Sequence, residues 1–377
     1  MKNYDAIIVG GGPAGSSCAW ALRRAGWDVL VMDKSPFPRD KVCAGWITPE
    51  VVQLLELDLE DYRRRHTLQA FSSFRTGLLG SALINTDYGH TVSYGILRRE
   101  FDDYLLRRSA ANTRPGEAMT SVDFRHGNWR INEQLQTPLL IGAGGHFCPV
   151  ARRLNPKADD DQQIVTAQEM EIAMDSAQQA QCRVRADTPE LYFLPMLDGY
   201  GWCVRKGDSL NIGLGRTENR HLAKHVAEFY AFLIQQNKVP AALPGRFRGH
   251  AYRLSSQRGQ RRLVGDGVML IGDAAGLAYP QSGEGIYTAI KSGLLAAATA
   301  VEANNDYRLA RLNNYTFRLD QFFDDKSVLP SLTFPKAIRG IAAQLLLKNH
   351  YFARHILLDK WFLHQAANRS LRARQQA

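Results

Sequence analysis

Runs of apolar residues, and the glycines between them, divide the start of the chain into a strand, a turn, a helix and a second strand. Tyr4–Val9 is a largely apolar run, Gly10–Gly15 is rich in glycine, and Ser16–Ala25 is rich in helix formers. Val29–Met32 is a second apolar run, which ends at Asp33. Continuously apolar strands are typical of parallel sheets covered on both faces. The pattern therefore predicts a βαβ unit.

The same reasoning places further elements along the chain. Arg98–Ala111 has apolar residues at helical spacing, Gly267–Ile271 is a buried strand, and Gly285–Ala303 is a long helix. Between these, residues 71–94 and 164–252 contain short alternating segments separated by turn residues. Such alternation predicts a sheet with one face toward solvent or ligand.

These elements predict an α/β protein built from discontinuous pieces. We expect a Rossmann-like nucleotide-binding domain, an inserted substrate domain with a mixed or antiparallel β-sheet, and a basic helical C-terminal segment. The expected bounds are residues 1–70, 95–155 and 256–325 for the first domain, 71–94 and 156–255 for the second, and 326–377 for the C-terminal segment.

Composition and charge narrow the class of protein. The 377 residues are 45% hydrophobic and 22% charged, which is typical of a globular chain. The net charge is +10, but no nucleic-acid-binding motif accompanies it, so we expect no nucleic acid partner. The five cysteines form no CxxC pair and no metal-ligand spacing, and we expect no secretory signal and no membrane span. The sequence predicts a cytoplasmic protein without a bound metal; it does not predict the oligomeric state.

The basic tail allows two interpretations. Phe334, Ile338, Ile341 and Leu345 recur at helical spacing among basic residues, and the segment Phe352–Leu363 repeats this pattern. Such helices either dock on an anionic membrane, which would place the protein peripherally at its inner face, or cap the nucleotide domain. We favour the cap, because apolar stripes normally face a core.

The glycines of the first turn carry the most specific signal. Gly10, Gly12 and Gly15 form a GxGxxG pattern between a strand and a helix, and Asp33 ends the next strand. The glycines allow a tight turn and close approach of a pyrophosphate to the helix N-terminus, while the carboxylate binds a ribose. An acid at this position disfavours a 2′-phosphate. The motif predicts FAD or NAD rather than NADP.

A second motif chooses between these dinucleotides. The strand that ends at Ile271 delivers Asp273 into a glycine-rich loop, and a helix begins near Gly285. A carboxylate beside a dinucleotide site can bind a polyol, which FAD has in its ribityl chain and NAD lacks. The helix N-terminus would stabilise negative charge on a reduced flavin ring. The sequence therefore predicts FAD.

Together these motifs resemble the FAD-dependent oxidoreductases of the para-hydroxybenzoate hydroxylase fold. The segments Pro38–Gly45, Tyr200-Gly201-Trp202 with Lys206-Gly207, and Pro280–Ile286 are most similar to the geranylgeranyl reductase family. The resemblance covers about residues 1 to 325. With the motifs above, it implies the following FAD-binding residues: Gly10, Gly12, Pro13, Ala14, Gly15, Asp33, Lys34, Arg39, Cys43, Ala44, Arg98, Gly272, Asp273, Pro280, Gly283, Glu284, Gly285 and Ile286.

The chain departs from the family pattern at three places. Gly142–His146 stands where most members carry an Asp-Gly pair that helps to clamp FAD, and Cys43-Ala44-Gly45 stands for Cys-Gly-Gly. Val204–Gly207 replaces Phe-Pro-Lys-Gly. There is no second GxGxxG, so NAD(P)H is a candidate reductant without a Rossmann site of its own.

Cys43 is the candidate catalytic residue. In the reductases the matching cysteine lies near the flavin, and Arg39 and Lys41 would lower its pKa if they were close, which suits a proton donor. The alternative is a cysteine that is merely a small buried side chain. His146 could act as a base or be an ordinary loop histidine. Four aromatic residues are candidates for an apolar substrate pocket, with core packing as the alternative: Trp46, Tyr200, Trp202 and Tyr252.

These features predict an enzyme, an FAD-dependent oxidoreductase that acts on a small apolar organic substrate. Reduction of carbon–carbon double bonds is the activity that the resemblance implies. Two alternatives remain on the same fold: a monooxygenase or halogenase, and a dehydrogenase that passes electrons to a quinone or a protein carrier.

Overall fold

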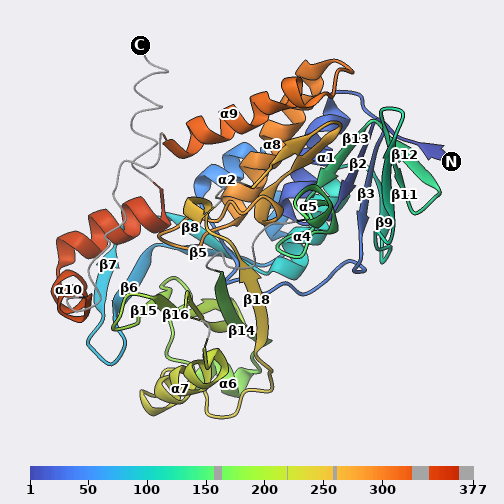
Figure 1. Ribbon diagram of the computed structural model, residues 1–377. Coiled ribbons are helices and arrows are strands. Elements are labelled where there is room, and N and C mark those ends of the chain that lie inside the picture. Colours follow the sequence, from blue (N-terminus) through green and yellow to red (C-terminus); the bar gives the residue numbers. More distant parts are fainter. Residues whose placement is uncertain (157–163, 219, 258–260, 325–338, 365–377) are drawn as a thin grey trace. The chain divides into compact units, whose positions relative to one another are not determined.

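The computed structural model describes residues 1–156, 164–218, 220–257, 261–324 and 339–364, and it divides the chain into two compact units (Figure 1). The first unit comprises residues 1–40, 99–163 and 252–329, and the second comprises residues 41–98, 164–251 and 330–377. Both units are thus discontinuous in sequence. Residues 41–70 group with the second unit, whereas the sequence assigned them to the nucleotide-binding domain.

The first unit is organised around a six-stranded sheet in the order β19-β20-β13-β2-β3-β9, parallel except for β19. Helices α1 and α8 pack against each other, and α8 also contacts α9 (Figure 1). The central strands are buried along their whole length, as continuous apolar runs require. The strands are β2 (Ala6–Val9), β3 (Val29–Asp33), β9 (Asn112–Pro115), β13 (Leu139–Gly142), β19 (Val264–Gly265) and β20 (Val268–Leu270).

Helices α1, α4 and α8 lie where the sequence predicted helices. Helices α5 and α9 and a small second sheet, β1-β12-β11-β10, were not predicted. The helices are α1 (Pro13–Arg24), α4 (Arg98–Arg108), α5 (Pro149–Leu154), α8 (Ile286–Ala303) and α9 (Leu309–Asp324). The strands of the small sheet are β1 (Lys2–Asn3), β10 (Val122–Arg125), β11 (Asn128–Ile131) and β12 (Leu135–Thr137).

The second unit contains a seven-stranded sheet in the order β18-β14-β17-β16-β15-β6-β7 and a three-stranded sheet, β4-β8-β5. The large sheet is mixed: β15 pairs parallel to β6, and the other described pairs are antiparallel. This agrees with the predicted mixed or antiparallel substrate domain. The strands are β4 (Trp46–Ile47), β5 (Leu68–Phe71), β6 (Ser73–Leu78), β7 (Ile84–Asp87), β8 (Ser93–Ile96), β14 (Val165–Ala173), β15 (Glu190–Phe193), β16 (Gly199–Lys206), β17 (Ser209–Arg216) and β18 (Arg248–Tyr252).

Helices α6 (Ser176–Gln181) and α7 (Leu222–Gln235) interrupt the region for which the sequence predicted only alternating strands, and α7 is the longer. Helix α7 buries Leu222, Val226, Phe229 and Leu233 against β14 and β17. These residues recur at helical spacing, so the sequence itself carried the signal for a helix. The prediction of strands there was wrong. The remaining helices are short: α2 (Pro49–Leu54) and α3 (Leu59–Arg63).

The described part of the tail forms α10 (Arg339–Leu346) and a π-helix over Phe352–Phe362. Within the second unit, the π-helix of the tail packs against β7. The expected cap on the nucleotide domain stays a prediction. Tyr88 Oη donates to Asp359 Oδ1 at 2.7 Å, and the Arg354 guanidinium lies 4.7 Å from the Tyr88 ring. Phe334 and Ile338 lie outside the described residues. None of the described helices is long and apolar enough to span a membrane.

Candidate functional site

The glycine-rich turn of the first unit joins β2 to α1. A Cβ on Gly15 would lie 1.9 Å from the Gly10 carbonyl oxygen, so only glycine allows this approach. Helix α1 begins at Pro13, with Gly12 as its N-cap, and no side chain caps it. Backbone N–H groups at an uncapped helix N-terminus are donors for an anion, which is the arrangement that a bound phosphate uses.

Asp33 stabilises this turn through hydrogen bonds to the backbone. Its Oδ2 accepts a hydrogen bond from the Gly11 N–H at 2.8 Å, and its Oδ1 accepts from the Ser35 N–H at 2.9 Å. The sequence assigned this carboxylate to a ribose alone. In the structure it also fixes the turn on which the phosphates would rest. Lys34 beside it is exposed.

Arg39 is held against the same turn by carboxylates. Its Nη2 lies 3.4 Å from Asp102 Oδ2 and 3.9 Å from Asp33 Oδ2. Asp102 is fully buried on α4, and the guanidinium lies over the Phe37 ring at 4.8 Å. Arg39 therefore lies beside the glycine-rich turn, and its role toward the cofactor stays a prediction. Arg98, the first residue of α4, is buried and groups with the second unit.

The second predicted motif meets the first. Gly272, which follows β20, has φ +60°, and a Cβ on it would lie 2.9 Å from Ala14 Cβ in α1. The Gly272 N–H donates to Ser292 Oγ at 2.9 Å. Asp273 Oδ1 lies 3.4 Å from the position of a Cβ on Gly285, the N-cap of α8. Two segments more than 250 residues apart in sequence thus lie side by side in this unit, as one predicted site requires.

The loop between Asp273 and α8 is closed by its own backbone. The Tyr279 N–H donates to the Glu284 carbonyl, and the Gly283 N–H donates to the Tyr279 carbonyl, both at 2.9 Å. Glu284 Oε1 accepts from the Tyr287 N–H at 2.6 Å, so this carboxylate caps α8. A Cβ on Gly283 would lie 2.4 Å from Tyr252 Oη, which places Tyr252 beside this loop. Pro280 and Ile286 flank the turn; Ile286 is buried.

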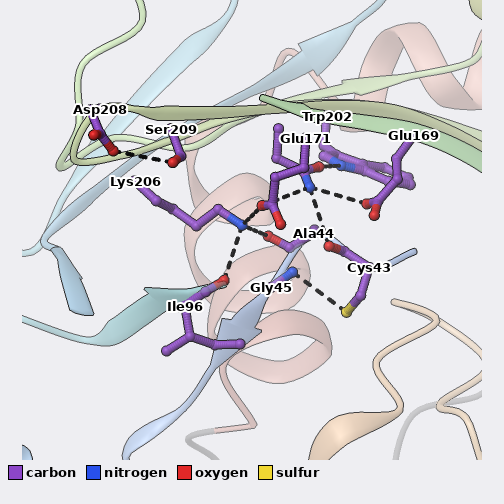
Figure 2. A network of polar contacts seen from close by, with 11 residues as sticks. Cys43, Ala44, Gly45, Ile96, Glu169, Glu171, Trp202, Lys206, Asp208 and Ser209 are labelled. Atoms are coloured by element: carbon purple, nitrogen blue, oxygen red, sulfur yellow. Dashed lines mark hydrogen bonds and ion pairs between the residues drawn. The ribbon is translucent and has the colours of Figure 1, made fainter. Parts of the chain in front are cut away.

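In the second unit, a network of polar side chains surrounds Cys43 (Figure 2). Cys43 is partly exposed, and the other four cysteines are buried. Asn211 Nδ2 donates to the Cys43 carbonyl at 3.3 Å, and the Cys43 N–H donates to the Glu169 carboxylate. Cys43 Sγ accepts from the Gly45 N–H at 3.4 Å. The thiol therefore lies on a segment whose backbone is fixed by side chains of the sheet.

Arg39 and Lys41, which flank Cys43 in sequence and would lower its pKa if they were close, have other described partners. Lys41 Nζ lies 2.7 Å from His250 Nε2, and Arg39 contacts Asp33 and Asp102. His146, the candidate base, is half-buried with its ring 4.7 Å from the Phe147 ring.

Three of the four predicted aromatic residues share one cluster in the second unit. Trp46 stacks on Phe74 and on Phe362, with ring centroids 4.9 and 5.5 Å apart. Tyr200 contacts Phe362 edge-on at 5.5 Å and lies 6.0 Å from Trp202. The cluster includes Phe362 from the C-terminal π-helix, which the sequence did not assign to it. Tyr252 belongs to the first unit.

Comparison with known proteins decides the family. Residues 103–316, more than half of the chain, match the family model described as FAD binding domain, and residues 5–76 match the model described as FAD dependent oxidoreductase. The chain belongs to this family of FAD-dependent oxidoreductases. FAD is its cofactor, and the family assignment made from the motifs is confirmed.

Named relatives of this flavoprotein are reductases. It is 27% identical to digeranylgeranylglycerophospholipid reductase 3 of Methanosphaera stadtmanae, over 86% of this chain and 85% of that one. It is 30% identical to a menaquinone reductase of Mycolicibacterium smegmatis, over 78% and 75%. The fold matches a geranylgeranyl bacteriochlorophyll reductase-like protein of Thermoplasma acidophilum, with a TM-score of 0.75, 21% identity and coverage of 97% and 96%.

The residues of the first unit fit FAD. The close approach at Gly15 leaves the turn free of side chains where a pyrophosphate would rest, and the N-terminus of α1 has no side-chain cap. Asp273 supplies a carboxylate next to the N-terminus of α8, which suits a polyol beside an electron-accepting ring. The roles of individual residues toward FAD stay predictions.

Sequence reasoning missed most of the flavoprotein's polar network. Glu169 and Glu171 alternate along β14 among apolar residues, so both point to one face of the sheet. Acids at alternate positions of a buried strand are unusual and could have drawn attention to this face. Nothing local links them to Lys206 and Asn211, which lie on β16 and β17.

Proposed function

We propose that this flavoprotein reduces carbon–carbon double bonds of an apolar, isoprenoid-type substrate. The observation that carries the proposal is that Asn211 bonds both to the Cys43 carbonyl and to Trp202 Nε1, the latter at 2.6 Å. Asn211 thus connects the backbone of Cys43, the candidate proton donor, with Trp202 of the aromatic cluster. The reductase relatives support this assignment.

Reduction of a double bond adds a hydride to one carbon and a proton to the other. FAD, when bound, supplies the hydride, and an external two-electron donor such as a nicotinamide restores its reduced state. Cys43 would hold the proton at Sγ and deliver it to the second carbon, and solvent would then reprotonate the thiolate. The cluster of Trp46, Tyr200 and Trp202 would bind the apolar chain and exclude water.

Residues of the first unit would hold the cofactor. The backbone of Gly12 to Gly15 would bind the pyrophosphate, Asp33 the ribose and Asp273 the ribityl chain, with Arg39 beside the turn. The N-terminus of α8 would stabilise negative charge on the ring.

The test is an anaerobic assay with dithionite or NADPH as reductant and geranylgeranyl lipids or menaquinone as substrates. Products that gain two hydrogens for each reduced double bond support the proposal. Cys43→Ala should lower kcat by about 10² or more while FAD content stays unchanged, because positioned proton donors contribute about 10²–10⁴. Oxygenated or halogenated products formed in air, with no alkene reduction under argon, would contradict it and favour the monooxygenase or halogenase alternative.

We also propose that α10 brings the enzyme to anionic membranes, where such lipids are found. Ile341 and Leu345 lie one helical turn apart and are 64% and 70% exposed, and Tyr351 beyond the helix is 70% exposed. Basic residues Arg339 and Lys348 flank them. An exposed apolar face with basic neighbours is the pattern of an interfacial helix.

Vesicle flotation tests this second point. Binding to vesicles with phosphatidylserine, and weaker binding to phosphatidylcholine alone, is the expected result. Ile341→Glu with Leu345→Glu should abolish flotation, whereas Phe317→Glu, at another exposed apolar residue on α9, should not. Equal flotation of both variants would contradict the role of α10.

A further inference from the structure

Lys206 is fully buried, and its ammonium group has three hydrogen-bond partners (Figure 2). Its Nζ donates to the Ala44 carbonyl at 3.1 Å and to the Ile96 carbonyl at 3.0 Å, and it pairs with the Glu171 carboxylate. A buried ammonium is costly unless all of its donors are satisfied. The lysine therefore connects the segment after Cys43 to β8 and to β14. These contacts offset the free-energy cost of removing its charge from water.

Asn211 and Glu169 hold the residue before Ala44. Asn211 Nδ2 lies 3.1 Å from Glu169 Oε2 and from Glu171 Oε1, and 3.3 Å from the Cys43 carbonyl oxygen. Glu169 accepts the Cys43 N–H. Both backbone polar groups of Cys43 and the carbonyl of Ala44 are thus bonded by side chains of three neighbouring strands. Cys43 itself lies in no strand or helix, so these side chains determine its position.

The charges in the network are unequal. Two carboxylates, Glu169 and Glu171, face one ammonium, Lys206. Lys206 forms its ion pair with Glu171, and among the described residues Glu169 has a hydrogen bond from Asn211 but no ion pair. Burial and the neighbouring charge of Glu171 raise the pKa of Glu169 to about 7. A group that gains or loses a proton near neutral pH therefore contacts the Cys43 backbone.

We infer that Glu169, Glu171, Lys206 and Asn211 form a positioning clamp that fixes the Cys43 thiol for proton transfer and responds to the protonation of Glu169. The clamp residues are positioning residues and need not contact substrate. The importance of Cys43 for reduction rests on the proposed function, but the clamp can be tested without it.

The test measures alkylation of Cys43 by iodoacetamide in the holoenzyme, followed by peptide mass mapping. Because the other four cysteines are buried, labelling in the native state selects Cys43. Lys206→Met combined with Glu171→Gln removes both partners of the ion pair, so neither of the two is left as an unpaired charge. We expect Cys43 to be labelled about tenfold faster in this double variant, because a lost hydrogen bond to a charged group permits local opening.

A matched control lies in the same sheet. Glu190 of β15 pairs with Lys238 at 2.7 Å and with Arg75 at 3.3 Å, so Lys238→Met removes an ion pair that involves no clamp residue. Its labelling rate should equal that of the wild type. In the wild type the labelling rate should show an inflection near pH 7 that Glu169→Gln abolishes. Unchanged labelling and an unchanged pH profile in the folded clamp variants would overturn the inference.

A kinetic readout then separates the clamp from the proposed function. If the enzyme reduces alkenes through Cys43, the double variant should lower kcat with little change in KM. Faster labelling without any alkene reduction by the wild type would retain the clamp and reject the proposed reaction.

Discussion

Gly272 and Ala14 lie so close that a Cβ on Gly272 would approach Ala14 Cβ to 2.9 Å. The first residue follows the late strand β20, and the second lies in the first turn of α1. Their contact places Asp273 beside the glycine turn of residues 10–15, so that one cofactor can engage both motifs. The two motifs lie far apart in sequence, and this contact brings them together as a shared ligand would require.

Substitution at Gly15 tests the glycine turn. Gly15→Ala would place a Cβ 1.9 Å from the Gly10 carbonyl oxygen, so the turn must shift and lose its phosphate-binding shape. We expect the purified variant to contain less than about a tenth of the wild-type FAD. Flavin absorbance after denaturation measures this. Gly340→Ala, which meets open space, should retain its FAD; equal FAD in both variants would refute the role of the turn.

Asp273 should contribute directly to cofactor affinity. Asp273→Asn removes the charge from a carboxylate next to the α8 N-terminus, and we expect the Kd for FAD to rise about 10-fold to 100-fold, since hydrogen bonds to charged groups contribute about 1.5–3 kcal/mol. Fluorescence titration of the apoprotein measures the Kd. Asp266→Asn serves as the control, because that side chain accepts from the Leu309 N–H in the same unit. An unchanged Kd for Asp273→Asn would contradict the ribityl assignment.

The raised pKa of Glu169 makes stability depend on pH. Between the ordinary carboxyl pKa near 4.5 and the folded value of about 7, the native state binds the proton more tightly than the unfolded chain does. Stability from this group is complete below about pH 4.5 and is lost as the pH rises through 7, by roughly 3 kcal/mol at most. Urea unfolding at pH 5 and pH 8 should show a smaller loss in Glu169→Gln than in the wild type. Glu228→Gln, on the surface of α7, should follow the wild type; the same behaviour of Glu169→Gln would refute the prediction.

Phe362 should stabilise the second unit. It is 5% exposed and stacks on Trp46, so Phe362→Ala leaves a cavity and should lower the free energy of unfolding by about 3 kcal/mol. Chemical unfolding monitored by tryptophan fluorescence measures the change. Phe317→Ala, at a residue that is 59% exposed, should change stability by less than about 0.5 kcal/mol. A similarly small effect at Phe362 would show that the tail does not pack as described.

The nucleotide unit was predictable because its signals are local. The apolar runs of β2 and β3, the glycines between β2 and α1, and the long helix after Asp273 each reflect a short-range constraint on the backbone. The missed α7 had an equally local signal in Val226 and Phe229, which was overlooked within a region of alternating strands.

The sequence by itself predicted a discontinuous FAD-binding domain, its glycine turn, a second FAD-binding motif at Asp273, and the candidate thiol. Only the tertiary structure decided what surrounds that thiol. Ile96, Glu169, Glu171, Lys206 and Asn211 come from four strands, and alternation along a strand says which face a side chain takes but not which distant loop will cover that face. That choice depends on packing between segments far apart in sequence. The buried Lys206 and Glu169 are tolerated there because they bond to the partly exposed Glu171, to Asn211 and to the backbone at Cys43 and Ala44.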